Sequence, residues 1–322
     1  MNPDCNQTHV DGYLDSLISQ RKLSPHTVCS YGRDLRELLA FIDVLADRPA
    51  LATVTHFHIR KFAAQLHSKG LGASSIARKL SAWRGFFDWL SQQTTLASNP
   101  VDGVRAPKRA QPLPKALSVE DAVGLVMQAS PDKDAGSAAQ RCNRAMFELL
   151  YSSGLRVSEL AALDLWYVHE PQYVSAGWID MDEHAVTVTG KGGKMRSVPV
   201  GRPAIEAIAA WLAVRATLVK ADPHPLFLSG RGTRMSPRVV QLRLKAHAQA
   251  VGTPADVHPH MLRHSFASHV LQSSGDLRAV QEMLGHASIS ATQIYTSLDF
   301  QRLAQVYDAA HPRARKKGAP KV

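Results

Sequence analysis

The sequence predicts a mainly α-helical chain with a small β-sheet (α+β) in its second domain, and a separate all-α, four-helix domain at its N-terminus. Three observations lead to this prediction. Residues 8–98 carry apolar side chains at helical spacing in four successive runs. Residues 105–115 hold three prolines and four basic residues. After that stretch helical runs continue, interrupted by one predicted hairpin, Ala185–Val200.

Length and composition describe an ordinary globular protein. The 322 residues allow two domains with cores of their own, and 45% of them are hydrophobic against 20% charged. No run of 18 apolar residues and no basic-then-apolar leader is present, so we expect a cytoplasmic protein without a membrane partner. The three cysteines are widely spaced, which fits a reducing compartment without disulfides.

The net charge of +11 favours a polyanionic partner, but it is concentrated in two segments. Residues 105–115 hold four basic residues and residues 311–322 hold five, with no acidic residue in either segment. The rest of the chain keeps a net charge of only +2. The charge therefore indicates basic connectors rather than a uniformly basic surface.

The N-terminal domain is expected to span residues 1–98. Its first helix carries Val10 to Ile18, and the second begins at the Ser24-Pro25 pair, a cap followed by a proline in the first turn. The third helix ends near Gly70, and the fourth begins at Ser75. Another face of the fourth helix carries Arg78, Lys79 and Arg84, which fits a solvated surface or a binding surface. Residues 99–116 are expected to form an extended basic linker.

The second domain, residues 117–322, is expected to open with a helix capped by Ser118. A later helix should end at Gly154, after which Arg156 begins a short helix with Glu159 one turn on. The hairpin follows, with Lys191 and Lys194 at its glycine-rich turn. Further helices are expected over 203–220, from Ser236-Pro237, and from Asp299 onward.

The stretch from Val257 to Tyr295 is predicted to form three helices that begin at Pro259, Asp276 and Ser288 or Ser290. His260, Arg263 and His264 occur at i, i+3 and i+4, so they share one face at the N-terminal end of the first helix. A helix N-terminus attracts anions, and cations placed there favour a phosphate site.

Each of these residues also fits a structural or solvated role. His258, His260 and His264 together raise the alternative of a metal site. However, the stretch has no His-Glu-x-x-His motif, no cysteine and few carboxylates, so we expect no metal ion and no other cofactor.

Three motifs in order then define a resemblance. They are His260-x-x-Arg263-His264, Leu284-Gly285-His286, and Tyr295 nine residues later. This pattern resembles the C-terminal signature of the tyrosine recombinases, the phage integrase family. The segment Gly154-Leu-Arg156-Val-Ser-Glu159-Leu is similar to the family's first arginine motif. Residues 292–296 and 306–313 resemble, more narrowly, the XerC group of bacterial chromosome-dimer resolvases.

The resemblance implies an enzyme that cuts and rejoins DNA through a 3′-phosphotyrosyl intermediate, without metal or ATP. It assigns Tyr295 as the nucleophile, Arg156 and Arg263 as phosphate clamps, and Lys191, from the hairpin turn, as general acid. It leaves His260 as candidate base and His286 as a donor to a phosphate oxygen. Glu159 would support the site, and the N-terminal domain would grip DNA.

The implied partners are a double-stranded, dif-like recombination site, a XerD-type recombinase in a heterotetramer, and an FtsK-type translocase. A phage or integron integrase, a type IB topoisomerase and a non-catalytic DNA-binding protein are the alternatives. The last helix has two possible positions, on its own domain or in a neighbouring protomer as in relatives. The sequence leaves both open.

Overall fold

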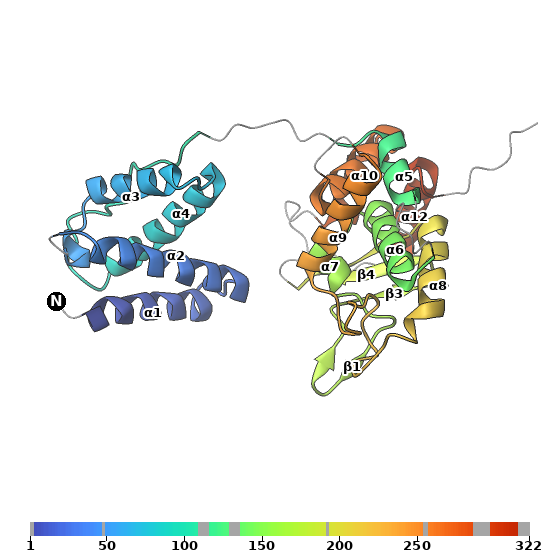
Figure 1. Cartoon of the computed structure of the whole chain (residues 1–322), viewed down its shortest axis with the longest axis horizontal. Helices are drawn as coiled ribbons and strands as arrows, with labels where there is room; N and C mark the ends of the chain where they lie inside the picture. The colour runs from blue at the N-terminus through green and yellow to red at the C-terminus, as the bar shows by residue number, and fades with distance from the viewer. Residues whose placement is uncertain are drawn as a thin grey trace, which may run out of the picture. The chain divides into compact units, whose positions relative to one another are not determined.

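The structure is a computed structural model that describes residues 3–46, 49–108, 116–128, 136–190, 193–253, 257–285 and 297–314. The chain divides into two compact units, Met1–Pro112 and Leu113–Val322 (Figure 1). Each unit has its own hydrophobic core. Within the described ranges, no helix is long and apolar enough to cross a membrane.

The first unit contains the four predicted helices. They are α1 (Pro3–Ser19), α2 (Pro25–Asp43), α3 (His56–Ser68) and α4 (Ala73–Leu90), with a short 3-10 turn at Leu51–Thr53. Ser24 caps α2 as predicted, its hydroxyl accepting from the Thr27 amide, whereas α4 begins two residues before the predicted Ser75. The core is rich in aromatic side chains from α1, α3 and α4, among them Tyr13, Phe62, Trp83 and Phe87.

Carboxylates on α2 neutralise two of the three cations predicted on α4. Asp34, which is buried, binds both Arg78 and Lys79, with 3.0 Å between Oδ1 and the Lys79 Nζ. Lys79 also pairs with Glu37. Burial opposes the charge of Lys79, but hydrogen bonds to Glu37 and Asp34 outweigh it and raise the Lys79 pKa. This pair of helices is therefore held together partly by ion pairs rather than leaving both cations free for a ligand.

The third cation, Arg84, holds the chain that leaves α4. Its Nη2 donates to the carbonyl oxygens of Val101 and Val104 at 3.3 and 3.2 Å, and both valines are buried in the core of the first unit. The side-chain amide of Asn99 donates to the Arg84 carbonyl oxygen at 3.1 Å. The first residues of the segment expected to form a linker are thus packed on the helical unit as far as Val104.

The second unit is helical around a small antiparallel sheet. Its helices are α5 (Val119–Met127), α6 (Ala138–Ser153), α7 (Val157–Ala161), α8 (Arg202–Arg215), α9 (Pro237–Ala250), α10 (Pro259–Ser274), α11 (Leu277–Leu284) and α12 (Ser297–Ala310). The predicted caps Ser118, Ser236 and Asp276 each accept from a backbone amide of the first turn. Helix α8 ends five residues before the predicted Lys220.

The sheet has one strand more than the predicted hairpin. Strands β4 (Ala185–Thr189) and β5 (Met195–Pro199) pair as expected, with Val186 opposite Val198, and β3 (Gly177–Asp180) adds to the free edge of β4. Strand β3 was not predicted because its four residues are too short for a period-2 pattern to stand out.

The segment before β3 forms a separate small hairpin, β1 (His169–Glu170) and β2 (Tyr173–Val174), which projects from this unit (Figure 1). The buried carboxylate of Asp164 anchors its base. One oxygen accepts from the Tyr173 and Ser175 hydroxyls at 2.7 and 2.6 Å, and the other accepts from Arg234 at 2.6 Å. A single satisfied carboxylate thus fixes this small hairpin to the unit.

Helix α12 packs on its own domain in this single chain, which is one of the two positions that the sequence left open. Leu303 and Tyr307 are buried in the core of the second unit, and the Tyr307 hydroxyl lies 2.6 Å from the Ser152 Oγ. Beyond the helix, the Arg313 guanidinium forms two hydrogen bonds with the fully buried carboxylate of Glu148 on α6.

We expect Arg313→Met to lower the free energy of unfolding by about 3–5 kcal/mol, because Glu148 would stay buried without its cation. Urea unfolding of the full chain, followed by circular dichroism, measures this. Arg302→Met is the matched control, since Arg302 is an exposed residue of α12 that pairs with Asp276 at 3.4 Å, and this variant should lose about 1 kcal/mol or less. Equal losses of unfolding free energy for the two variants would show that the buried Arg313–Glu148 pair does not stabilise the fold more than an exposed pair.

Candidate active site

The first arginine of the candidate site stands at a sharp break between two helices. Helix α6 ends at Gly154, whose φ of +58° lies in the left-handed region that favours glycine. A Cβ on Gly154 would also lie 2.4 Å from the Phe266 ring of α10, so this turn can approach α10 only without a side chain. Arg156 follows as the N-cap of α7, and the tight turn places it beside α10.

Glu159, one turn into α7, is the centre to which the arginines bind. Its two oxygens accept from the Arg156 Nη1 at 2.6 Å and from the Arg156 amide at 2.8 Å. They also accept from Arg196 at 2.9 and 2.8 Å. Burial by itself would raise the Glu159 pKa, but the hydrogen bonds and charge of Arg196, followed by the hydrogen bonds from Arg156, lower it. Glu159 is therefore a charged, four-fold bonded anchor.

Arg196 on β5 was missed by the sequence reasoning, although a signal was present. It shares the inward face of β5 with Val198, because side chains two residues apart lie on one side of a strand. An arginine at an inward position needs a partner, since an unpaired buried charge is costly. Its remaining hydrogen bond runs from Nε to the Met283 carbonyl oxygen at 2.8 Å, at the end of α11.

Arg263, the second predicted clamp, lies on α10 and binds two helix ends. Its Nη1 donates to the Gly154 carbonyl oxygen and its Nη2 to the Leu284 carbonyl oxygen, both at 2.6 Å. Because Met283 and Leu284 are consecutive, Arg196 and Arg263 converge on the same end of α11. Burial, followed by the positive charge of Arg156, lowers the Arg263 pKa to about 10.

The cluster has more positive than negative charge. The carboxylate of Glu159 binds the guanidiniums of Arg156 and Arg196, and the charge of Arg263 lies close enough to interact with all three, which leaves a surplus of two positive charges among the described residues. Arg156 is the member most open to a ligand, with 32% of its side chain exposed against 4% for Arg196. Such an arrangement can receive an anion with forked hydrogen bonds, and a phosphate has the matching charge and geometry.

The histidines of α10 stand at the start of that helix. His258 is the N-cap, and its Nδ1 accepts from the Met261 amide at 3.2 Å. His260 and His264 are exposed, and the His260 ring centre lies 6.4 Å from that of His258. His260 is thus available to a ligand one helical turn before Arg263, as predicted. Grouped histidines also raised the metal alternative, but in the described ranges no three His, Cys, Asp or Glu side chains form a metal-binding group.

Three predicted site residues, Lys191, His286 and Tyr295, lie outside the described residues. The structure describes the positions just before two of them. Gly190 directly follows β4, and its amide donates to the Lys194 carbonyl oxygen at 2.7 Å. Gly285 ends α11 with a φ of +64° and lies against the Arg196 side chain. Both flanking glycines therefore belong to the neighbourhood of the arginine cluster.

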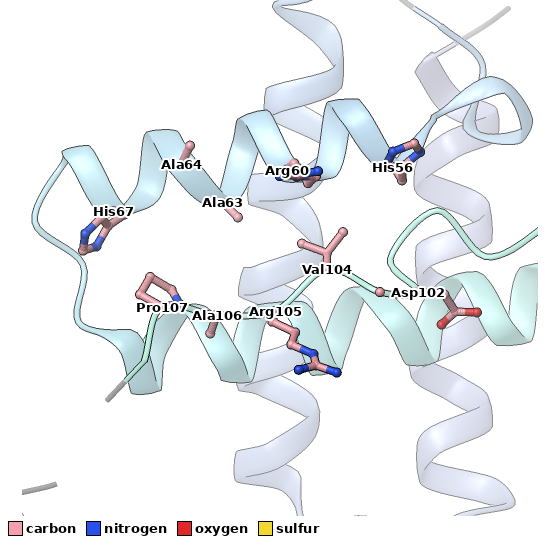
Figure 2. Close-up of a pocket in the computed structure, with 11 residues that line it drawn as sticks. His56, Arg60, Ala63, Ala64, His67, Asp102, Val104, Arg105, Ala106 and Pro107 are labelled. Atoms are coloured by element: carbon pink, nitrogen blue, oxygen red, sulfur yellow. The ribbon is translucent and has the colours of Figure 1, made fainter. Parts of the chain in front are cut away.

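The first unit carries a basic groove of about 620 Å³ between α3 and the chain at residues 102–107 (Figure 2). His56, Arg60 and His67 line it from α3, and Arg105 lines it from the opposite side. Among the described residues, Arg60 and Arg105 pair with no carboxylate. Asp102, the acidic residue that lines the groove, has its Oδ1 3.7 Å from the Nε of Arg84. Ala63, Val104 and Pro107 supply an apolar lining.

Two protein-family models together match most of the chain. Residues 119–302 match the phage integrase family, and residues 10–94 match the phage integrase N-terminal SAM-like domain. Among curated proteins, tyrosine recombinase XerC of Ralstonia pickettii (strain 12J) is 56% identical over 96% of this chain and 94% of its own length. Tyrosine recombinase XerC of Alcanivorax borkumensis is 46% identical over 98% of each chain.

Two solved structures share the fold at lower identity. The XerH site-specific recombinase, bound to its palindromic difH substrate after cleavage, has a TM-score of 0.65 and 20% identity, covering 89% of this chain and 81% of that chain. A lambda integrase dimer bound to a core site has a TM-score of 0.64 and 19% identity, covering 90% and 99%. At these identities, the likeness concerns the fold.

Proposed function

Because the chain belongs to the phage integrase family and is a tyrosine-type site-specific DNA recombinase, we propose that it acts as a XerC-like resolvase of chromosome and plasmid dimers. Its proposed substrate is a double-stranded, dif-like site, and its proposed setting is the cytoplasm, where chromosomal DNA lies. The identity of 46% to 56% with proteins named XerC supports this reading over a phage or integron integrase.

The arginine cluster is the observation that carries the chemistry. A scissile phosphodiester carries one negative charge, and more charge gathers on its non-bridging oxygens as a nucleophile approaches. The two surplus positive charges around Glu159 match that demand, and they are fixed before substrate arrives because Arg156 and Arg263 are already bonded to the scaffold. Losing one such prearranged donor typically costs about 3–4 kcal/mol in the barrier.

In the proposed first step, the Tyr295 oxygen bonds to phosphorus while the bond between phosphorus and the 5′-oxygen breaks. The electron pair of the broken bond leaves with the 5′-oxygen, which takes a proton from Lys191, and the tyrosine proton passes to His260. General acid–base catalysis of this kind contributes roughly 10²–10⁴-fold. His286 would donate to a non-bridging oxygen.

The product of that step is a 3′-phosphotyrosyl bond, which conserves the energy of the phosphodiester. Attack by the 5′-hydroxyl of a second strand reverses the chemistry, releases Tyr295 and joins the strands. No ATP is required by this sequence of steps. The arginines, which stay charged at working pH, would supply the charge stabilisation that many nucleases take from a metal ion.

The proposed assembly is a heterotetramer with a XerD-type recombinase, in which protomer pairs exchange strands through a Holliday junction, with an FtsK-type translocase as regulator. Two strands must be cut in each of two duplexes, so one nucleophile per chain requires four chains. A type IB topoisomerase would use similar chemistry alone. A non-catalytic DNA-binding protein is disfavoured because all six predicted catalytic positions are filled.

The first unit is proposed to grip the duplex, with residues 99–116 as a basic connector and residues 117–322 as the catalytic domain. Two of the cations on α4 are engaged by α2 carboxylates, whereas Arg60 and Arg105 face the groove without an acidic partner among the described residues. We therefore propose the groove as a DNA-backbone contact.

Tyr295→Phe is expected to bind DNA with wild-type affinity but to form no covalent adduct, because only the nucleophilic oxygen is removed. The measurement is trapping on a nicked dif-like suicide duplex, with the adduct detected by its shift in a denaturing gel. Wild-type protein should form the adduct in excess EDTA. Adduct formation by Tyr295→Phe, or none by wild type on any Xer-type site, contradicts the proposal.

The double variant Arg60→Gln/Arg105→Gln should weaken DNA binding and flatten the plot of log affinity against log salt by about two units of slope, because each arginine would neutralise one phosphate. Titrations at several salt concentrations by fluorescence anisotropy give the slope. Lys22→Gln removes a cation from the same unit outside the groove and should change the slope little. An unchanged slope for the double variant would exclude the groove as the place where the DNA backbone binds.

A further inference from the structure

Arg196 contacts the scaffold of three separate predicted catalytic residues. Its fork binds Glu159, which in turn holds Arg156. A Cβ added at Gly285, next to His286, would lie 3.1–3.2 Å from its Cδ, Nε and Nη1 atoms. A Cβ added at Gly190, next to Lys191, would lie 3.5 Å from its Nη1. One side chain therefore contacts Glu159, which holds Arg156, and lies beside the two glycines that directly precede His286 and Lys191 in the sequence.

The hydrogen bonds of Arg196 leave little room for direct substrate binding. Its side chain is only 4% exposed, and all three guanidinium nitrogens donate to Glu159 or to the Met283 carbonyl oxygen. Arg156, by contrast, keeps part of its guanidinium open to a ligand. A guanidinium with every nitrogen engaged by protein fixes geometry rather than binding a phosphate.

We propose that Arg196 is a positioning residue for DNA cleavage, which sets the placement of Arg156 relative to the end of α11 without touching the DNA. This inference rests on the proposed function. It follows from the geometry because the planar fork fixes both Glu159 oxygens, while Nε fixes the end of α11 in the same plane. Lysine, with a single ammonium, cannot reproduce the fork and the bond to α11 together.

The test compares Arg196→Lys with wild type in single-turnover cleavage of a suicide duplex and in half-site DNA binding. Cleavage should fall about 100-fold, the size of effect expected when catalytic groups are misplaced by about 1 Å. The dissociation constant for DNA should stay within about threefold, because the groups that face the DNA are retained.

Arg215 provides a matched control for the loss of a buried arginine. It is 5% exposed in the same unit, and its described hydrogen bonds go to the backbone carbonyl oxygens of Pro223, Pro225 and Leu226. Arg215→Lys should lower the melting temperature comparably to Arg196→Lys yet keep the cleavage rate per folded molecule. Equal cleavage losses in the two variants would reduce Arg196 to a purely structural residue.

A double-mutant cycle separates positioning from destabilisation. If Arg196 acts largely through Arg156, the loss caused by Arg196→Lys should shrink about tenfold or more in an Arg156→Ala background. Independent, multiplicative losses would overturn the proposal. Should Arg196→Lys fail to fold, Arg196→Met/Glu159→Gln removes both charges and avoids an unpaired carboxylate; normal cleavage by it also overturns the proposal. Absence of wild-type cleavage would instead refute the proposed function itself.

Discussion

The forked ion pairs on Glu159 are the interaction on which the described part of the candidate site depends. A buried carboxylate bound by two guanidiniums is stable only with good geometry, because desolvation of the charges otherwise exceeds their attraction. Glu159 meets this condition with four hydrogen bonds. The constraint brings α7, β5 and the end of α11 together, and it leaves positive charge that an external anion can balance.

The two helix ends at Gly154 and Gly285 are a second feature that holds the candidate site together. Both glycines are left-handed caps, and the carbonyl oxygens of Gly154 and of Leu284, the residue before the second cap, accept from Arg263. The C-terminal end of a helix carries partial negative charge, so two helix dipoles stabilise the positive charge of this guanidinium. Arg263 thus joins α6, α10 and α11, and its burial restrains its position before substrate binds.

Much of the fold could be predicted from the sequence because its helices have strong local signals. Ser24-Pro25, Ser118, Ser236, Asp276, Gly154 and Gly285 begin or end helices as expected. Strand β3 and the small β1–β2 hairpin were not predicted, because two to four residues carry no reliable period and their positions depend on tertiary contacts such as that of Asp164. Within the site, Arg156, His260 and Arg263 belong to the sequence motifs that define the family resemblance, whereas Arg196 lies outside those motifs. Its inward position on β5 was readable, but its partner Glu159, 37 residues away, was not.

We propose that the arginine cluster balances the charge of a scissile phosphate. The most direct measurement uses a methylphosphonate at that position, since the methyl group replaces a charged oxygen. On ordinary DNA, Arg156→Ala and Arg263→Ala should each slow cleavage by about 10²–10³-fold, as for the removal of other charge-stabilising donors. On methylphosphonate DNA, the loss should shrink to about tenfold or less for both variants, because there is less charge to balance. An undiminished loss on the neutral linkage would show that these arginines serve another purpose, and the account given for the cluster would be wrong.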